Sequence, residues 1–457
     1  MVALPAAARF PTTMKITRRT LLGAPALLSA AGSRPNILWI FGDDLGPQLS
    51  CYGHSLVHTP NIDRIAAGGV RFNRCYTTAP VCSASRSAFN VGLYQTATGT
   101  HHHRSNRQDG YRLPAGARLL SHRLRDAGYF TANVGEIAPG VKGSGKTDFN
   151  FTVDGPPFDG THWNQRPEGK PFYAQINFTA PHKGPAFVEA RKRPNLIDPG
   201  KVDLPPYYPD HPVVRDEVAN YYDAIQLLDE KVGVVLAQLE KDKLLDNTAI
   251  FLIGDNGRCL LRGKQWLYDA GTHVPFLLHW PGNVKKGEVR DDLVSGVDWT
   301  ATTLDIAGVS IPEQFHGQSV LKRKRTHVIT CRDRCDMTLD RIRAIRDDRY
   351  KLIRNYMPER PYTQFNQYIQ DSYPTLSVLR ELHAKGRLNA VQQQFMAPRK
   401  PEIELYDTKA DPHEINNLAA QPAHREYVKT LSAQLTSWLQ ATGDKGAKPE
   451  DPSSAKL

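Results

Sequence analysis

Long apolar runs are missing from almost the whole of this 457-residue chain. Beyond residue 33, no stretch approaches the roughly 20 apolar residues that a membrane-spanning helix needs, so we expect no membrane span. Cysteine is scarce as well, and the scatter of the six cysteines excludes a disulfide framework and a zinc-site spacing. Cys331 and Cys335 could pair in an oxidising compartment, or both could stay free. Internal repeats are absent, and this length favours two domains.

The one apolar segment of note stands at the N-terminus, behind positive charges. Arg18 and Arg19 precede TLLGAPALLSAAG, an order typical of a twin-arginine export signal. We therefore predict that residues 1–33 are a cleaved export signal and that the protein is exported, to a bacterial periplasm. A disordered basic tail is the alternative interpretation.

Acidic residues are too few to balance the basic ones. The net charge is +11, and removal of the four positive charges before residue 32 leaves +7. A modest positive field favours acidic substrates, although a solvated surface without a partner would have the same composition. Clusters such as KRKR at 322–325 are interpreted as linker surface, so we expect no nucleic-acid partner.

Short apolar runs that end in polar residues recur over residues 34–325. NILWIFGDD (36–44), PFYAQINFTAPH (171–182) and TAIFLIGDNG (248–257) each have the pattern of a strand buried on both faces. Helical stretches separate them, which predicts an α/β fold with a large, mostly parallel sheet sandwiched by helices. Ligands of such sheets bind beyond the carboxyl ends of the strands, where the polar clusters lie.

The pattern changes after residue 325. RIRAIRDDRYKLIRNY (341–356) alternates in the manner of two strands around a turn, and REYVKTLSAQLTSWLQAT (425–442) has the pattern of a helix. We predict a smaller C-terminal subdomain over residues 326–443, an antiparallel sheet plus a helix. Residues 444–457 are expected to be a disordered tail.

Acidic and amide side chains close two of the predicted strands. Asp43 and Asp44 end the first, and Asp255 and Asn256 follow the last. Adjacent acids repel one another unless a cation or solvent compensates. Carboxylate and amide oxygens suit a hard cation, so these residues predict a Ca²⁺ site, with Mg²⁺ as the alternative.

An unusual cysteine lies in TTAPVCSASRSAFNVG (77–92), where small residues leave Cys82 little to pack against. The stretch from Cys82 to Arg86 matches the C-x-[P/A]-x-R signature of type I sulfatases, in the alkaline phosphatase superfamily. GKQWLYDAGTHVPFLLHWPG with Lys264, TAPHKGP with His182, and ELYDTKADPHEINNLA resemble further segments of that family. The resemblance covers residues 35–440. Over residues 332–364 the chain most resembles the heparan N-sulfatase-like branch of the family.

The resemblance implies that Cys82 is oxidised to formylglycine by a maturation enzyme that reads this segment while it is extended. One hydroxyl of the hydrated aldehyde would attack sulfur, and the second would then expel sulfate, which splits one hard displacement into two easier steps. Ala84 stands where many members have proline, which leaves the maturation system open.

The resemblance also assigns the other site residues. Arg86, Lys264 and a second lysine would stabilise charge on the sulfuryl oxygens. His182 would hold a sulfate oxygen or protonate the leaving group. The metal ligands implied are Asp43, Asp44, residue 82, Asp255 and Asn256.

One motif departs from the family pattern. GYFTANVGEIAPG carries Glu136 and Ala138 where members usually have a lysine and a histidine. SGKTDFNF, ten residues on, offers Lys146, which we interpret as the displaced lysine, with Gly140, Gly143 and Gly145 permitting the chain to fold back. Asp148, or one of His101, His102 and His103, is expected to replace the histidine.

The sequence therefore predicts a sulfatase that hydrolyses sulfate esters or sulfamates of a sulfated carbohydrate, a glycosaminoglycan such as heparan sulfate. A phosphonate or phosphodiester hydrolase of the same superfamily is one alternative, because phosphate and sulfate esters share tetrahedral geometry. A catalytically inactive polyanion-binding protein is the other, because the lysine–histidine motif is missing.

Overall fold

The computed structural model describes residues 34–105 and 110–448. The predicted export signal, residues 1–33, lies outside the described residues, as does most of the predicted tail. Within the described ranges, no helix is both long and apolar enough to cross a membrane. The chain from Arg34 onward forms one compact unit that contains both of the predicted sheets.

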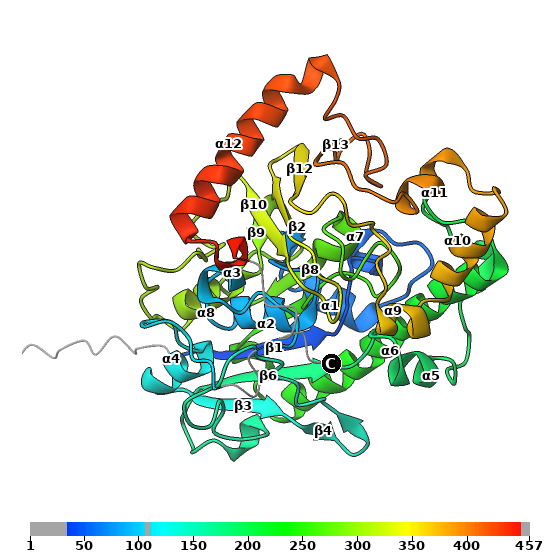
Figure 1. Cartoon of the computed structure of the whole chain (residues 1–457). Coiled ribbons are helices and arrows are strands. Elements are labelled where there is room, and N and C mark those ends of the chain that lie inside the picture. The colour runs from blue at the N-terminus through cyan, green and yellow to red at the C-terminus, as the bar shows by residue number, and fades with distance from the viewer. Residues whose placement is uncertain (1–33, 106–109, 449–457) are drawn as a thin grey trace, which may run out of the picture. The chain divides into compact units, whose positions relative to one another are not determined.

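A seven-stranded sheet organises the larger part of this unit (Figure 1). β3, β6, β1 and β7 are parallel, β8 is antiparallel to both of its neighbours, and β9 is parallel to β2. The prediction of a mostly parallel sheet is confirmed. In spatial order the strands are β3 (Phe130–Val134), β6 (Phe172–Phe178), β1 (Asn36–Gly42), β7 (Thr248–Gly254), β8 (His273–His279), β2 (Val70–Tyr76) and β9 (Glu288–Ser295).

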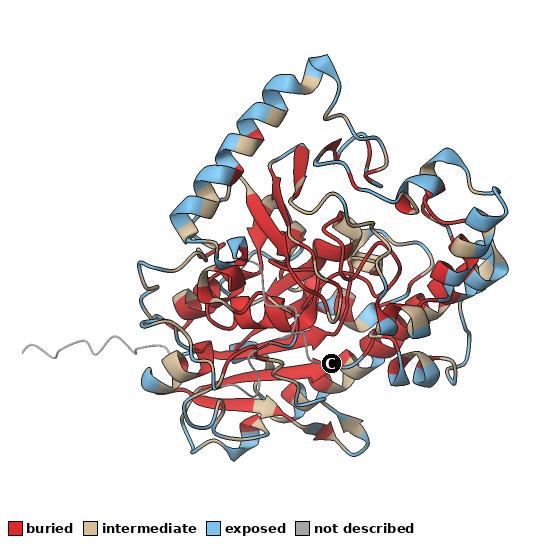
Figure 2. Cartoon of the chain, in the orientation of Figure 1, coloured by how far each residue is buried: buried red, intermediate tan, exposed pale blue. Residues whose placement is uncertain are grey.

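The central strands are apolar because helices cover both faces of the sheet. Side chains alternate along β1, so that Leu38 and Ile40 pack in the core formed with α1 and α6. Trp39 and Phe41 pack on the opposite face, in the core formed with α2, α4 and α8. Figure 2 shows the central strands as buried.

Helices connect the strands, and loops next to several of these helices supply residues of the site described below. α6 is the longest of them and begins at a proline in the first turn, with His211 as its N-cap. The helices are α1 (Pro60–Ala67), α2 (Cys82–Phe89), α3 (Gln95–Thr98), α4 (Leu120–Asp126), α5 (Pro185–Ala190), α6 (Pro212–Lys241), α7 (Asp269–Thr272), α8 (Val297–Ile306), α9 (Gln367–Ser372), α10 (Pro374–Ala384), α11 (Ala390–Phe395) and α12 (Arg425–Thr442).

A four-stranded antiparallel sheet with a helix follows residue 325, as predicted. The predicted hairpin forms its centre, and Leu431 and Leu435 of α12 pack against one face. A two-stranded hairpin of β4 (Glu136–Ala138) and β5 (Val141–Lys142) was not predicted. The strands of the small sheet are β10 (Val328–Arg332), β11 (Ile342–Arg346), β12 (Tyr350–Asn355) and β13 (Ile403–Asp407).

Two expectations are decided by buried side chains of the small sheet. Arg343 is inaccessible, and Asp444 accepts hydrogen bonds from it at 2.9 and 3.1 Å. Arg343 also pairs with Asp333 at 2.9 Å, and Lys445–Ala447 form a short 3-10 helix, so the described part of the expected tail is ordered against the small sheet. Cys331 and Cys335 are both buried and free.

Candidate active site

The polar ends of β1 and β7 meet at one edge of the large sheet. The two strands pair in register up to Gly42 and Gly254, which sets the residues that follow them side by side. The backbone N–H of Asp44 donates to Asp255 Oδ1 at 3.0 Å, and Asn256 Nδ2 donates to Asp44 Oδ1 at 2.7 Å. Asp43 lies in the same cluster, so the structure brings together the four strand-end residues that the sequence predicted as metal ligands.

Cys82 joins this cluster from the first turn of α2. Its Sγ lies 3.8 Å from Asp44 Oδ1, and one acceptor atom each of Asp43, Asp44, Cys82 and Asp255 lies within 4.8 Å of the others. The side chain is 1% exposed, and burial raises the pKa of the thiol to about 12, although Lys146 and Lys264 oppose the shift. Residue 82 thus belongs to the acidic cluster.

Arg86 lies one turn further along α2 and is anchored on several sides. Its Nε donates to Asp255 Oδ2 at 2.8 Å, and its Nη1 donates to Asn177 Oδ1 at 2.7 Å. Its Nη2 lies 3.7 Å from Asp43 Oδ1 and has no hydrogen-bond partner among the described residues. The guanidinium is therefore held in place with one donor group uncommitted.

Lys264 reaches the cluster from the loop after β7. Its Nζ donates to Asp44 Oδ2 at 2.9 Å, and its side chain is almost fully buried. Burial lowers the pKa of this lysine, but the surrounding acidic groups, Asp44 foremost, together outweigh burial and raise the pKa well above the usual value. Lys264 is thus a cation beside Asp44 at neutral pH.

The lysine of the displaced motif also reaches the cluster. Lys146 Nζ donates to both carboxylate oxygens of Asp43, at 2.9 and 3.0 Å. The chain turns back through left-handed backbone at Gly140 (φ 81°) and Gly145 (φ 63°), where glycine carries no steric cost. Asn133 Nδ2 fixes the loop by donating to Gly145 O at 2.7 Å. Lys142 is exposed on β5.

The charges within the cluster shift the pKa values of its carboxyl groups in opposite directions. Burial raises the pKa of Asp43, but the cations Lys146, His182 and Arg86 outweigh it and hold this pKa well below the usual range. Burial and the negative charge of Asp43 raise the pKa of Asp255 to about 6. Like charges this close favour a bound cation.

His182 lies beyond the end of β6, and its two ring nitrogens face different partners. Nδ1 lies 2.6 Å from Lys183 O, which fixes the neutral ring with its proton on Nδ1. Nε2 lies 3.6 Å from Asp44 Oδ2, so this nitrogen faces the cluster. Burial and the charge of Lys264 lower the pKa of the ring.

The residues offered in place of the missing histidine lie in different surroundings. Asp148 Oδ2 is 3.6 Å from Lys146 Nζ. His103 is buried and pairs through Nδ1 with Asp336 Oδ1 at 2.8 Å, and the rings of His101 and His102 lie 4.2 Å apart. Of these four residues, Asp148 is the one with an ion pair to a predicted site lysine.

Sequence reasoning missed two residues of the site. Asn177 of β6 holds Arg86, and the signal was a buried polar side chain, one of two with Gln175, in a largely apolar strand. Tyr368 of α9 places its ring 5.6 Å from Lys264 Nζ and 6.1 Å from the ring of His182. No local pattern marked Tyr368, because it comes from the C-terminal part of the chain.

The donor set fits a hard divalent cation. Asp43, Asp44 and Asp255 supply carboxylate oxygens in a buried cluster, and Asn256 Oδ1 is buried without a hydrogen-bond partner among the described residues. A buried carbonyl oxygen left without a donor is costly, and a cation would satisfy it. Oxygen-rich sets of this kind suit calcium better than softer metals.

The fold and the acidic cluster around residue 82 define a hydrolase of the alkaline phosphatase superfamily. The family model "Sulfatase" matches residues 35–165 and 141–309, and the model "N-sulphoglucosamine sulphohydrolase, C-terminal" matches residues 260–394. The chain belongs to the sulfatase family and is a sulfuric ester hydrolase.

Curated relatives and solved structures agree with this membership. An ulvan-active sulfatase of Formosa agariphila is 34% identical, over 93% of this chain and 78% of that protein. Human N-sulphoglucosamine sulphohydrolase is 26% identical over 92% of each chain. A structure described as a complex with its substrate D-glucosamine-2-N,6-O-disulfate has a TM-score of 0.67 at 19% identity, covering 90% of this chain and 98% of that one. The phosphonate monoester hydrolase of Agrobacterium radiobacter has a TM-score of 0.66 at 18% identity, over 90% and 96%, so the fold is shared beyond sulfatases.

Proposed function

We propose that this sulfatase removes sulfate from a sulfated carbohydrate, with a formylglycine made from Cys82 as its nucleophile. The observation that carries the proposal is the convergence of Cys82 with three buried carboxylates inside one 4.8 Å cluster. Arg86, Lys146 and Lys264 surround that cluster with positive charge. A buried residue among cations suits a negatively charged sulfuryl group.

Calcium is the proposed metal, held by Asp43, Asp44, Asp255, Asn256 and the modified residue 82. When bound, it would supply charge neutralisation for the carboxylates and Lewis-acid stabilisation for the sulfate group. Formylglycine would supply a hydrated aldehyde, whose hydroxyl is a better nucleophile than a buried thiol. Because Cys82 is 1% exposed in the folded chain, we propose that its oxidation precedes folding.

Side chains of the protein itself are proposed to bind the sulfate group and to transfer the proton. The ammonium groups of Lys146 and Lys264 and the uncommitted Nη2 of Arg86 bind and orient the sulfuryl oxygens. His182 keeps one proton on Nδ1 through Lys183 O, so Nε2 is the atom that takes or gives a proton at the leaving group. Asp148 is proposed to orient Lys146 in place of the missing histidine.

The proposed substrate class is a saccharide that carries several anionic groups. Support comes from the relatives, because one acts on ulvan and another is named for N-sulphoglucosamine. Fragments of a glycosaminoglycan such as heparan sulfate are our specific proposal, as sulfate esters or sulfamates. The N-terminal twin-arginine pattern supports export to a periplasm, where such saccharides would be met.

Two measurements on enzyme produced with a maturation system test the proposal. The peptide that contains residue 82 should be lighter than the cysteine form by about 18 Da, the difference between a thiol and an aldehyde. Sulfate release should be measured from heparan sulfate fragments and ulvan, beside aryl sulfate, phosphate and phosphonate esters of one leaving group. Faster hydrolysis of the phosphate or phosphonate ester than of the sulfate ester would contradict the proposed substrate and indicate a phosphoryl hydrolase. Tight saccharide binding without sulfate release would indicate an inactive binding protein.

A further inference from the structure

A cavity of about 170 Å³ lies outside the active site, between three segments of the chain. Gln48 comes from the segment after β1, Arg258 and Arg262 come from the loop after β7, and His413 comes from the C-terminal subdomain. His413 is exposed, so the cavity is open to solvent on that side. None of the residues assigned to the active site lines it.

Arg258 is a buried cation without a carboxylate partner. The residue is 9% exposed, and its guanidinium donates through Nη2 to the hydroxyl of Tyr207. Its Nε is buried and has no hydrogen-bond partner among the described residues. No carboxylate in residues 34–105 or 110–448 lies within the 4.0 Å of an ion pair, although buried charges are normally paired.

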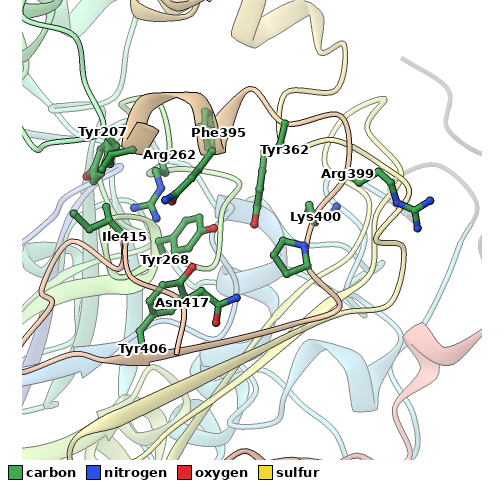
Figure 3. Close-up of a pocket in the computed structure, with 14 residues that line it drawn as sticks. Tyr207, Arg262, Tyr268, Tyr362, Phe395, Arg399, Lys400, Tyr406, Ile415 and Asn417 are labelled. Carbon is green, nitrogen blue, oxygen red and sulfur yellow. The ribbon is translucent and has the colours of Figure 1, made fainter. Parts of the chain in front are cut away.

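Arg262, four residues further along the same loop, is a second buried cation at this cavity. Its Nη1 and Nη2 donate to the backbone carbonyls of His413 and Glu414, at 2.8 and 2.6 Å. Its guanidinium carbon lies 3.6 Å from the ring centre of Tyr268 and 4.5 Å from that of Tyr207. Figure 3 shows these three side chains among those that line the neighbouring pocket. Carbonyls and aromatic rings lower the cost of burying this charge without neutralising it. Within the part of the chain described, Arg262 also has no ion pair.

The two acids that line the cavity are already neutralised by other cations. Asp269 pairs with Lys351 at 3.0 Å and also with Arg346, and Lys351 pairs with Glu414 at 2.8 Å. These two carboxylates balance Arg346 and Lys351. Glu414 also attracts Arg262 from beyond ion-pair distance, so Arg262 is partly compensated and Arg258 is the cation left without a carboxylate.

We infer that this cavity binds a small tetrahedral dianion, sulfate or phosphate, with Arg258 as its anchor. The uncompensated guanidinium of Arg258 and the partly compensated one of Arg262 attract an oxyanion, and the Tyr207 hydroxyl adds a hydrogen-bonding group beside Arg258. A volume of 170 Å³ admits a few water molecules at about 30 Å³ each, which suits such an ion and is too small for a saccharide. Inorganic sulfate is the product of the family's reaction, and phosphate is the alternative source of the same chemistry.

The site has a physical connection to the active site through the loop after β7. Arg258 lies three residues after Asp255, and its carbonyl accepts a hydrogen bond from the backbone N–H of Lys264 at 2.9 Å. An anion bound to the Arg258 side chain would thus stabilise the loop that contains Arg258 and Lys264.

Thermal unfolding of the full-length enzyme tests the inference, with sodium sulfate titrated at constant ionic strength against sodium chloride. At ten times its dissociation constant, a ligand raises the ratio of folded to unfolded protein about elevenfold. Because sulfate also binds an active site of this family, the readout is the part of the response that Arg258→Gln removes. Arg399→Gln is the matched control, since Arg399 is exposed and lines the neighbouring pocket instead.

We expect Arg399→Gln to keep the whole sulfate response and Arg258→Gln to lose the component from this cavity. An unchanged response in Arg258→Gln, or a response to chloride equal to that for sulfate, would overturn the inference. A parallel phosphate titration decides which dianion binds more tightly. If Arg258→Gln does not fold, wild-type crystals soaked in sodium selenate give the answer. Anomalous density beside Arg258 supports the site, and density confined to the active site refutes it. Neither outcome depends on the saccharide specificity proposed above.

Discussion

Replacing Lys146 by alanine should separate catalysis from folding more clearly than any other change in this chain. Its ammonium group binds both oxygens of Asp43 at 2.9 and 3.0 Å, whereas the nearest other cation, Arg86, lies 3.7 Å from that carboxylate. Loss of one such group aimed at the transition state costs about 10²–10³ in turnover. We therefore expect kcat on a sulfated saccharide to fall by about that factor.

The effect on stability should depend on the metal. Breaking a buried ion pair costs about 3–5 kcal/mol when the remaining charge has no other partner. A bound Ca²⁺ would compensate Asp43, so Lys146→Ala should lower the unfolding temperature clearly in the metal-free protein and only slightly in the loaded protein. The Lys146 side chain is 21% exposed, which places the metal-free loss at the lower end of that range.

Lys142→Ala is the matched control, because Lys142 lies in the same excursion of the chain but is exposed on β5. Steady-state sulfate release and thermal unfolding, each with and without calcium, measure both effects. Equal and small changes from the two substitutions would refute the role of Lys146. If the turnover of calcium-loaded Lys146→Ala fell only in proportion to the loss of folded protein, the role of Lys146 would be structural alone.

Three further outcomes are expected. Cys82→Ala should abolish sulfate release while circular dichroism and unfolding temperature stay near wild type; residual activity would exclude residue 82 as the nucleophile. Exhaustive chelation should abolish turnover, and added calcium should restore it better than magnesium; full activity after chelation would exclude the metal. His316 is a neutral acceptor for the Tyr94 N–H at 3.0 Å, and burial with the charge of Arg325 lowers its pKa from 6.5 to about 4. Its contribution to stability is therefore complete above pH 6.5 and lost as the pH falls through about 4, by at most about 3 kcal/mol. His316→Asn should flatten that loss in denaturant unfolding, and an unchanged pH profile would contradict it.

The sequence alone determined three neighbouring strands of the large sheet and the acidic half of the site. Continuous apolar runs predicted β1, β6 and β7, because a strand that packs on both faces is apolar along most of its length. The residues after β1 and β7 had to meet, because neighbouring parallel strands end at the same edge. The small neighbours of Cys82 and the resemblance to the sulfatase signature marked Cys82 and Arg86, which lie one turn apart on α2. These features are local, so a local pattern records them.

Only the tertiary structure decided which distant side chains complete the site. Lys146 reaches Asp43 because glycines turn the loop back and Asn133 fixes it to the sheet edge, and no spacing rule predicts that path. Tyr368 meets Lys264 because the C-terminal part of the chain packs against the loop after β7. The uncompensated charge of Arg258 became visible only when its neighbours were known. Charge balance depends on distances between segments far apart in the chain, and a sequence does not contain those distances.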